Sequence, residues 1–454
     1  MRLNNTILLS IVALLGAGCS IEPDFTPPKP NLPIEWKTGE QNSSVEALNK
    51  WWEKLGDSTL NALVDKAFEQ NREIAVVAAQ NESFMAQLGI AESNLLPHFE
   101  ADASMSRQEL LNSTSNRIYG FNLAMSRFEI DFWSKYARAE ESAKAALLAS
   151  EYNAKIVKSS IAANVVSVYN ALLTQHRLLE NAKKNSLLLE QIASISKAKW
   201  EQGVGSFRDV LQAGASADEA RGEIPPIEAK ISVLENALSL LIGEFPKSFT
   251  IPNADISLLE IDIPVGLPSE LLRRRPDILS AEASLHSANA SIGVAKAAYF
   301  PSFSLTAMLG YQSTDFAALL KAPSQIWQVA PSATLPIFDA GQIENKVKYA
   351  KAKTKEAQAQ YEQTVLKALG EVESALKERR TLVDESKALT NAQKKYIQAE
   401  LLSRVEYDNG KTGYLPLLII RQSLVMNEKK IVLNEEAKRE NFIVLCKVLG
   451  GGWE

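Results

Sequence analysis

Two long stretches of the chain contain almost no residue that interrupts a helix. Residues 121–202 include neither glycine nor proline, and residues 342–409 include only Gly370. The sequence therefore predicts helices over about residues 135–199 and 343–407, each roughly 95 Å long at about 1.5 Å per residue. Helices of that length are stable only when other helices pack along them from end to end. The fold must therefore place other helices beside both.

The segments that flank these helices occur twice. Residues 88–91 and 96–99 (Leu-Gly-Ile-Ala and Leu-Pro-His-Phe) match residues 292–295 and 300–303 (Ile-Gly-Val-Ala and Phe-Pro-Ser-Phe). Apolar positions in the long helices and the glycines beyond them match in the same order, about 200 residues apart. We therefore expect an α+β fold with two structural repeats, each made of a helix, a β-hairpin, a long helix and a returning helix.

Each repeat contains a segment with the two-residue period of a β-hairpin, at residues 97–131 and 301–339. In the last of the four predicted strands, over residues 327–338, Pro331 and Pro336 indicate a bend or a late start. Four strands are about half of the smallest closed membrane barrel. Other copies of the chain must therefore complete the sheet.

Each long helix is predicted to end in a tight turn that contains glycine, at residues 201–206 and 408–413. Glycine adopts the positive φ angle that a reversal between two helices needs. Antiparallel helices are then expected over residues 207–243 and 414–450, and the pair Pro225-Pro226 must break or kink the first of them.

The N-terminus has the features of a secreted lipoprotein. Arg2 precedes the apolar residues 7–15, which are too few to span a bilayer as a transmembrane anchor. Small residues then lead to Cys19, a pattern that resembles the bacterial lipobox, in which the cysteine becomes the lipidated first residue. By the same resemblance, Ser20 favours transfer to the outer membrane. The proline-rich residues up to Trp36 are predicted to form an extended strap.

These features divide the chain into consecutive segments. They are a signal peptide (1–18), a lipidated strap (19–56), a first repeat (57–246) with its hairpin (97–131) and its long helix and turn (135–206), a linker (247–266), a second repeat (267–450) with its hairpin (301–339) and its long helix and turn (342–413), and a tail (451–454).

Composition and motifs argue against catalysis. Forty-nine Lys+Arg against 54 Asp+Glu give a net charge of −5, which offers no footprint for nucleic acid. Three histidines and two cysteines are too few and too scattered for a zinc site or a disulfide framework. Residues 410–412 (Gly-Lys-Thr) resemble the end of a phosphate-binding loop, but Val405 replaces its first glycine and a helix precedes it. We expect no enzyme activity, no metal and no cofactor besides covalent lipid on Cys19, and we expect Arg273–Arg275 on a solvated helix face.

Three stretches are similar to signature sequences of one known family. They are residues 128–133 (Phe-Glu-Ile-Asp-Phe-Trp), 271–278 (Leu-Leu-Arg-Arg-Arg-Pro-Asp-Ile) and 297–301 (Ala-Ala-Tyr-Phe-Pro). With Cys19, the strap, the repeats and the glycine turns, they resemble the lipoprotein branch of the outer membrane factor family, the TolC and OprM type. The resemblance implies a homotrimer. Its twelve-stranded transmembrane β-barrel, four strands per protomer, would continue through a mixed equatorial region into a twelve-helix periplasmic α-barrel.

The same resemblance implies a passive exit duct for drugs or other small toxic molecules in a tripartite efflux pump. An inner-membrane RND-type transporter would supply energy and a periplasmic adaptor would bridge to this lipid-anchored outer-membrane channel. Two alternatives stay open, a duct for type I-like protein secretion and a purely structural envelope lipoprotein. The sequence does not indicate the exported substrate, the cognate pump, or whether several pumps share the channel.

The resemblance also assigns roles to the two turns. The residues that would contact the adaptor are Gly203, Val204, Gly205, Gly410, Lys411 and Thr412. The residues of the candidate periplasmic gate are Trp200, Arg208, Asp209, Tyr407 and Tyr414, with apolar side chains near Leu417. Pro416 occupies the position that matches Asp209 in the second repeat, so only one carboxylate is expected there. The alternative is that Asp209 only stabilises the first turn of its helix through the helix dipole.

Overall fold

A computed structural model describes residues 25–28, 30, 32–37, 49–108, 116–249 and 267–452. The predicted signal peptide, Cys19 and most of the predicted linker lie outside the described residues. The chain forms two compact units. The first unit comprises the N-terminal residues to Pro30 with Ala79–Tyr152 and Asp277–Thr364, and the second comprises Asn31–Ala78, Asn153–Pro276 and Val365–Glu454.

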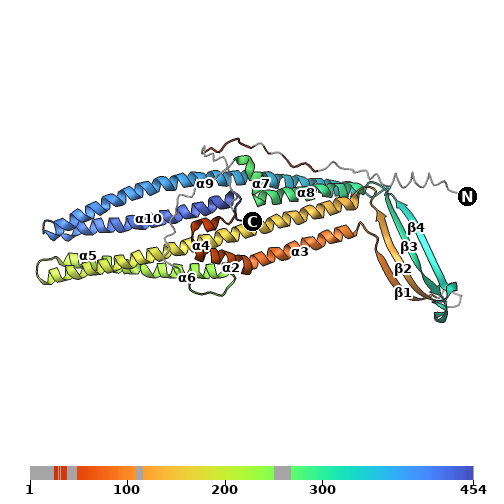
Figure 1. Ribbon diagram of the computed structural model, residues 1–454, viewed down its shortest axis with the longest axis horizontal. Coiled ribbons are helices and arrows are strands. Elements are labelled where there is room, and N and C mark those ends of the chain that lie inside the picture. Colours follow the sequence, from red (N-terminus) through yellow and green to blue (C-terminus); the bar gives the residue numbers. More distant parts are fainter. Residues whose placement is uncertain are drawn as a thin grey trace. The chain divides into compact units, whose positions relative to one another are not determined.

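The same order of elements occurs twice along the chain, as the sequence predicts (Figure 1). In the first half the elements are η1 (Trp51–Leu55), α2 (Ser58–Gln70), α3 (Arg72–Ser93), β1 (Phe99–Gln108), β2 (Asn116–Ile130), α4 (Lys135–Glu201), α5 (Phe207–Gly222) and α6 (Ile224–Leu241). In the second half they are η2 (Pro268–Glu270), α7 (Leu271–Arg274), α8 (Pro276–Ala297), β3 (Ser302–Ser313), η3 (Phe316–Ala318), η4 (Ala322–Ser324), β4 (Gln325–Thr334), α9 (Gln342–Asp408) and α10 (Tyr414–Val448).

The helices agree with the prediction except at one break. The two long helices, α4 and α9, have 67 residues each and end within two residues of the predicted limits. The first returning helix is interrupted at Glu223, just before the two prolines. The one helix expected before the hairpin of the first repeat is instead two helices, because Asn71 ends α2 in an extended conformation and caps α3. Its side-chain oxygen accepts hydrogen bonds from the backbone N–H groups of Glu73 and Ile74, at 2.8 and 3.3 Å.

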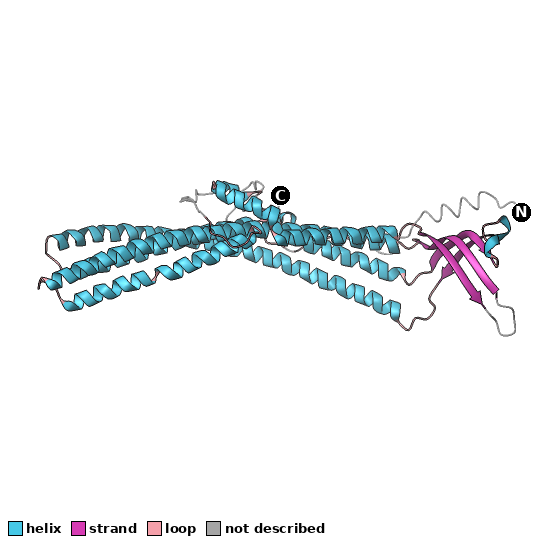
Figure 2. Ribbon diagram, turned by 90° about the horizontal axis from the view of Figure 1, so that it is seen from below, coloured by secondary structure: helices cyan, strands magenta, loops and turns pink. Residues whose placement is uncertain are grey.

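The first unit contains a four-stranded antiparallel sheet in the order β1-β2-β3-β4 (Figure 2). The strand predicted over residues 327–338 instead begins at Gln325 and ends at Thr334, before Pro336, so the expected late start is wrong. Pro331 lies inside β4, opposite Leu305 of β3. Pro331 has no N–H group, so it contributes no backbone donor to the sheet at that position.

Small and polar side chains bring the helices of the first unit together. The Ser142 hydroxyl lies 3.0 Å from that of Ser287 and donates to the Ser287 carbonyl at 2.9 Å. His286 Nε2 lies 2.8 Å from a Glu141 carboxylate oxygen, and the other oxygen accepts from Arg138 at 2.6 Å. Burial alone would raise the pKa of Glu141, but its hydrogen bonds with His286 and Arg138 outweigh burial and hold that pKa below its usual value.

In the second unit, a ladder of three buried asparagines joins α10 to α9. Asn427, Asn434 and Asn441 are spaced by one heptad and are about 95% buried. Their amide groups donate to α9 carbonyls that are also one heptad apart, those of Leu389, Leu382 and Ala375, at 3.4, 3.2 and 2.9 Å. Because a shift of one residue would leave these buried amides without partners, the ladder fixes the register of the two helices.

Buried polar groups also tie the N-terminal part of the second unit to the long helices. Asp57 caps α2 and accepts a 2.6 Å hydrogen bond from the buried Tyr169 hydroxyl of α4. The expectation that Arg273–Arg275 lie on a solvated helix face is wrong for Arg275, whose side chain is buried, with the residue 7% exposed. Its guanidinium donates to the Val448 carbonyl at 3.1 Å and to Glu371 at 2.7 Å. Arg273 is exposed as expected.

Candidate functional site

The two faces of the sheet differ in polarity. The strand register aligns the apolar positions of neighbouring strands, so that Ala103 faces Phe121, and Phe121 faces Tyr311. One face therefore carries Phe99, Ala101, Met105, Leu123, Leu305, Ala307, Leu309, Trp327 and Val329. The other face carries Glu100, Asp102, Ser104, Asn122, Ser304, Thr306, Gln328 and Ser332.

A β-bulge in β2 preserves this separation of faces. The register shifts by one residue between Met125 and Phe128. Without the extra residue, Phe128 and Ile130 would point to the polar face, because side chains alternate along a strand. With it, Phe128 lies opposite Leu305 and Ile130 lies opposite Phe303, on the apolar face.

Aromatic residues lie at both ends of the apolar face. Phe99, Phe128 and Phe303 are near the ends of the strands that connect to helices, and Tyr119, Tyr311 and Trp327 are near the opposite ends. Small and aliphatic side chains fill the space between them. An apolar band bordered by two aromatic girdles is typical of the lipid-facing side of a transmembrane β-barrel.

The two glycine turns have the same backbone geometry, and both belong to the second unit. Gly203 and Gly410 have positive φ angles of 75° and 70°. In each turn the glycine N–H donates three residues back, to the carbonyls of Trp200 and Tyr407, at 2.9 and 3.0 Å. The next N–H donates five residues back, at 3.0 and 2.9 Å, which completes a Schellman motif at the end of α4 and of α9.

Aromatic pairs close both turns. Trp200 lies against Phe207 with ring centroids 5.1 Å apart, and Tyr407 contacts Tyr414 edge to face at 5.3 Å. Lys199 of α4 donates to the Tyr407 hydroxyl of α9, and its ammonium lies 4.3 Å from the centre of that ring. The structure therefore brings Tyr407 and Tyr414 together with Lys199, a residue that the sequence analysis did not single out, while Trp200 pairs with Phe207 in its own turn.

The other predicted turn residues are exposed. This group comprises Gly203, Val204, Gly205, Arg208, Asp209, Gly410, Lys411 and Thr412. Exposed apolar side chains surround them, with Val204 exposed by 74% and Leu211 by 60%. Leu417, near which the sequence analysis places apolar gate residues, is itself 2% exposed and packs inside the protomer. Leu415 and Ile419 are the exposed apolar residues beside it.

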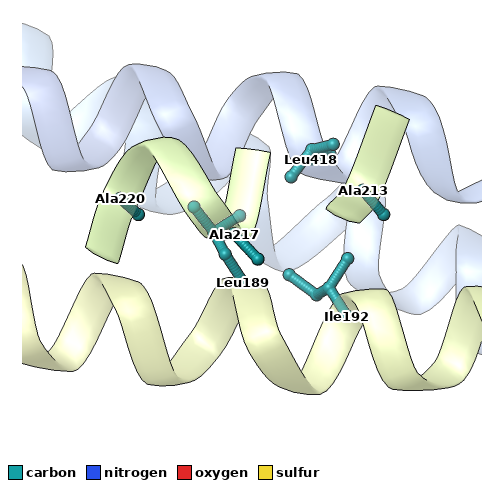
Figure 3. Packing of buried hydrophobic residues seen from close by; sticks show 6 residues of the cluster. All are labelled: Leu189, Ile192, Ala213, Ala217, Ala220 and Leu418. Atoms are coloured by element: carbon teal, nitrogen blue, oxygen red, sulfur yellow. The ribbon is translucent and has the colours of Figure 1, made fainter. Parts of the chain in front are cut away.

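A core made of alanines and larger aliphatic residues lies close to the turns (Figure 3). Leu189 and Ile192 of α4 face a row of alanines on α5, and Leu418 of α10 completes the cluster (Figure 3). The alanines are Ala213, Ala217 and Ala220. Because alanine side chains are short, they let the helix axes approach closely and keep the two helical hairpins in contact near their ends.

The described part of the chain holds no group of three or more His, Cys, Asp or Glu side chains that could bind a metal ion. Cys446 is fully buried, and burial raises the pKa of its thiol, so it fills space in the core. The candidate functional surfaces of the described residues are therefore the two-faced sheet and the helical turns.

The sequence model of the outer membrane efflux protein family matches residues 63–244 and 267–451. The chain belongs to this family. The resemblance inferred from the signature stretches is confirmed, and so are a role in efflux and a location in the outer membrane. The family consists of channel proteins and not of enzymes.

Curated relatives extend over almost the whole chain. The solvent efflux pump outer membrane protein SrpC of Pseudomonas putida is 31% identical, with 97% of each chain covered. The outer membrane protein OprJ of Pseudomonas aeruginosa is 30% identical, with 98% of this chain and 95% of the relative covered. The cation efflux system protein CusC of Escherichia coli is 29% identical, with 98% of each chain covered.

Solved structures give the same result for the fold. The outer-membrane channel OprN superposes with a TM-score of 0.88 at 27% identity, over 96% of this chain and all of that one. The open state of the MtrE outer membrane channel of Neisseria gonorrhoeae superposes with a TM-score of 0.87 at 28% identity, over 96% of this chain and 99% of the other.

Proposed function

We propose that three copies of this chain form the outer-membrane exit duct of a tripartite efflux pump. The observation that carries the proposal is the amphipathic four-stranded sheet with two open edges, β1 and β4. In lipid, unpaired backbone groups at such edges cost several kcal/mol each, so the edges must pair with other strands. Pairing β1 of one protomer with β4 of the next closes a barrel of twelve strands, with the apolar face toward lipid and the polar face toward the lumen.

Family membership and the exposed turns support the proposed pump partners. A periplasmic adaptor would contact the turns, and an inner-membrane transporter of the RND type would supply energy. Relatives of this chain carry the names of solvent, toluene, antibiotic and cation efflux systems, which indicates that proteins of the same fold export many kinds of substrate. We therefore assign the export of small toxic molecules and no single substrate. Protein secretion is the alternative, and a pump-dependent efflux assay separates the two.

The test combines oligomeric state with conductance. Purified protein should be a trimer by native mass spectrometry and should form ion-conducting channels in a planar bilayer. Deleting the gene should sensitise cells to compounds that the pump exports, and the cloned gene should restore resistance. A detergent-solubilised monomer with full strand content would contradict the shared barrel. A trimer without conductance would leave only a structural envelope role.

Cys19 is proposed to carry the lipid that anchors the mature N-terminus in the inner leaflet of the outer membrane. The lipobox-like sequence before it and Ser20 after it support this assignment. A lipid chain adds membrane affinity to that of the barrel, so Cys19→Ser should reduce sorting but leave inserted trimers stable. Labelling with a radioactive fatty acid should mark the wild type and not the variant. An unlabelled wild type would refute lipidation.

The turns are proposed to form the periplasmic gate and the adaptor contact. Asp209 lies in the first turn of α5, next to the Ser206 cap, and its side chain is exposed. Among the described residues, its carboxylate makes no hydrogen bond or ion pair. The link from Lys199 to Tyr407 joins the two helical hairpins of one protomer. Three copies of Asp209 near the tunnel end would form a ring of negative charge that constricts the pore.

Asp209→Ala is expected to raise single-channel conductance and to weaken block by multivalent cations, because the ring would lose its three carboxylates. An increase of about twofold would follow if the ring limits conductance. Asp65→Ala, at an exposed acidic residue of α2, is the matched control and should leave conductance unchanged. Equal conductance in both variants would mean that Asp209 serves only as a helix N-terminal charge.

A further inference from the structure

The connection between β3 and β4 is apolar, although it joins the strand ends that lie farthest from the helices. It contains η3, followed by Leu319 and Leu320. The Phe316 side chain is 70% exposed and that of Leu320 is 71% exposed. A connection surrounded by water is usually polar, so these side chains favour an apolar environment outside the protomer.

This connection and the apolar face of the sheet line an open cavity of about 580 Å³. Met105 and Phe121 line it from the sheet, and Phe316 and Leu320 line it from the connection. The Tyr119 ring contacts Phe316 at 5.4 Å between centroids and closes one side. The volume is in the range of pockets that bind organic ligands, and the lining is mainly apolar.

Basic residues follow the lining residues of the cavity, in the strand register and along the chain. Arg107 and Arg117 are directly opposite each other in β1 and β2, one pair beyond Met105 and Tyr119 on the same face. Lys321 follows Leu320 and is exposed. An apolar lining followed by basic residues complements an amphiphile that has acyl chains and a phosphorylated headgroup.

We propose that this cavity binds lipid A of the outer leaflet, with an acyl chain on Phe121 and Phe316 and the phosphates near Arg117 and Lys321. The inference rests on the proposed function, because it needs the apolar face to lie in the outer membrane. The cavity is continuous with the lipid-facing band, which favours lipid as the occupant. A neighbouring copy would pair at the strand edges, in the plane of the sheet, and would leave this face open.

The test measures binding of purified hexa-acylated lipid A to the full-length trimer in detergent, by native mass spectrometry and by the shift in unfolding temperature. Phe316→Ser combined with Leu320→Ser should weaken binding by about tenfold or more, since two large apolar contacts are lost. The matched control is Leu309→Ser with Val329→Ser, at two exposed positions of the same face outside the cavity, 52% and 57% exposed. Its binding should stay within about twofold of the wild type. Equal weakening in both variants would overturn the proposal.

A second arm tests the headgroup. Arg117→Gln should weaken lipid A binding about fivefold and leave the binding of zwitterionic phosphatidylethanolamine unchanged. Unchanged lipid A binding in this variant would overturn the assignment to lipid A. A trimer that dissociates in lipid-free detergent when Phe316 and Leu320 are replaced would show that the cavity is a subunit contact, which also overturns it. The conductance and the efflux activity of the wild type are measured separately. If the wild type binds lipid A but neither conducts ions nor supports efflux, the result counts against the proposed function alone.

Discussion

Gly310→Ala is expected to prevent assembly of a stable barrel. Gly310 is in the middle of β3, opposite Asn122 of β2, on the polar face. A Cβ atom there would lie 2.4 Å from the Phe121 carbonyl oxygen and 2.7 Å from the Asn122 Cα atom. Since both are backbone atoms, β2 and β3 would have to separate. Overpacking alone costs about 1–3 kcal/mol, and backbone hydrogen bonds lost in lipid add to that.

The yield of folded trimer should therefore fall by about tenfold or more, measured by heat-resistant migration and by strand content in detergent. Gly120→Ala is the matched control, because Gly120 lies on the same face of the neighbouring strand. A Cβ atom at Gly120 would contact only side-chain atoms. These are the Ser104 hydroxyl oxygen, at 2.9 Å, and the Asn122 side-chain nitrogen, at 3.5 Å. The Ser104 hydroxyl can rotate away, so this variant should assemble almost normally. Similar yields for the two variants would contradict the close approach at Gly310.

The elements of the sheet could be predicted from the sequence, but their relation to one another could not. Alternation identifies the apolar positions of β2 up to Met125, and there the two-residue period fails. The bulge restores the apolar face at Phe128, and only the pairing with β3 reveals it. The close contact at Gly310 is hidden for the same reason, because a glycine in a strand does not indicate which neighbour needs the space.

In the helices, the hydrophobic pattern of the sequence does not reveal which polar residues are buried. The long helices follow from the absence of glycine and proline, and the structure confirms them. Asn427, Asn434 and Asn441 look like exposed polar positions in the sequence, yet they are buried and bond to α9. Arg275 is buried in the same way, on the Val448 carbonyl and Glu371. A buried polar side chain is satisfied by a partner distant in sequence, so the local pattern cannot report it.

At the turns, the sequence predicted the glycines and the aromatic residues but could not tell which of the neighbouring apolar side chains are exposed. Val204, Phe207, Leu211 and Leu415 are about half to three-quarters exposed, whereas Leu417 is buried. Leu415 and Leu417 are two residues apart and so lie on opposite sides of α10. Side chains left exposed on both turns favour contact with a partner protein, and the adaptor is the partner that the proposed function supplies.

Gly410→Val is expected to abolish most pump-dependent efflux while leaving the trimer intact. Gly410 has a φ angle of 70°, which a β-branched residue adopts only at a cost of about 1–2 kcal/mol. Nothing lies within 4 Å of the position of a Cβ atom there, so the conflict is in the backbone and not in packing. The strained turn would relax by losing its Schellman hydrogen bonds and moving Lys411 and Thr412, two of the proposed adaptor contacts.

Gly413→Ala provides the matched control in the same turn. Gly413 has a φ angle of −71°, and nothing lies within 4 Å of a Cβ atom there, so alanine fits without strain. Resistance to exported compounds should be close to wild type in Gly413→Ala and close to the deletion strain in Gly410→Val, with equal amounts of trimer in the outer membrane. Because strain at Gly410 is confined to the end of a long hairpin, it should not reach the sheet. Normal resistance in Gly410→Val would mean that the turn only connects two helices, and reduced trimer would mean that its geometry is needed for folding and not for docking.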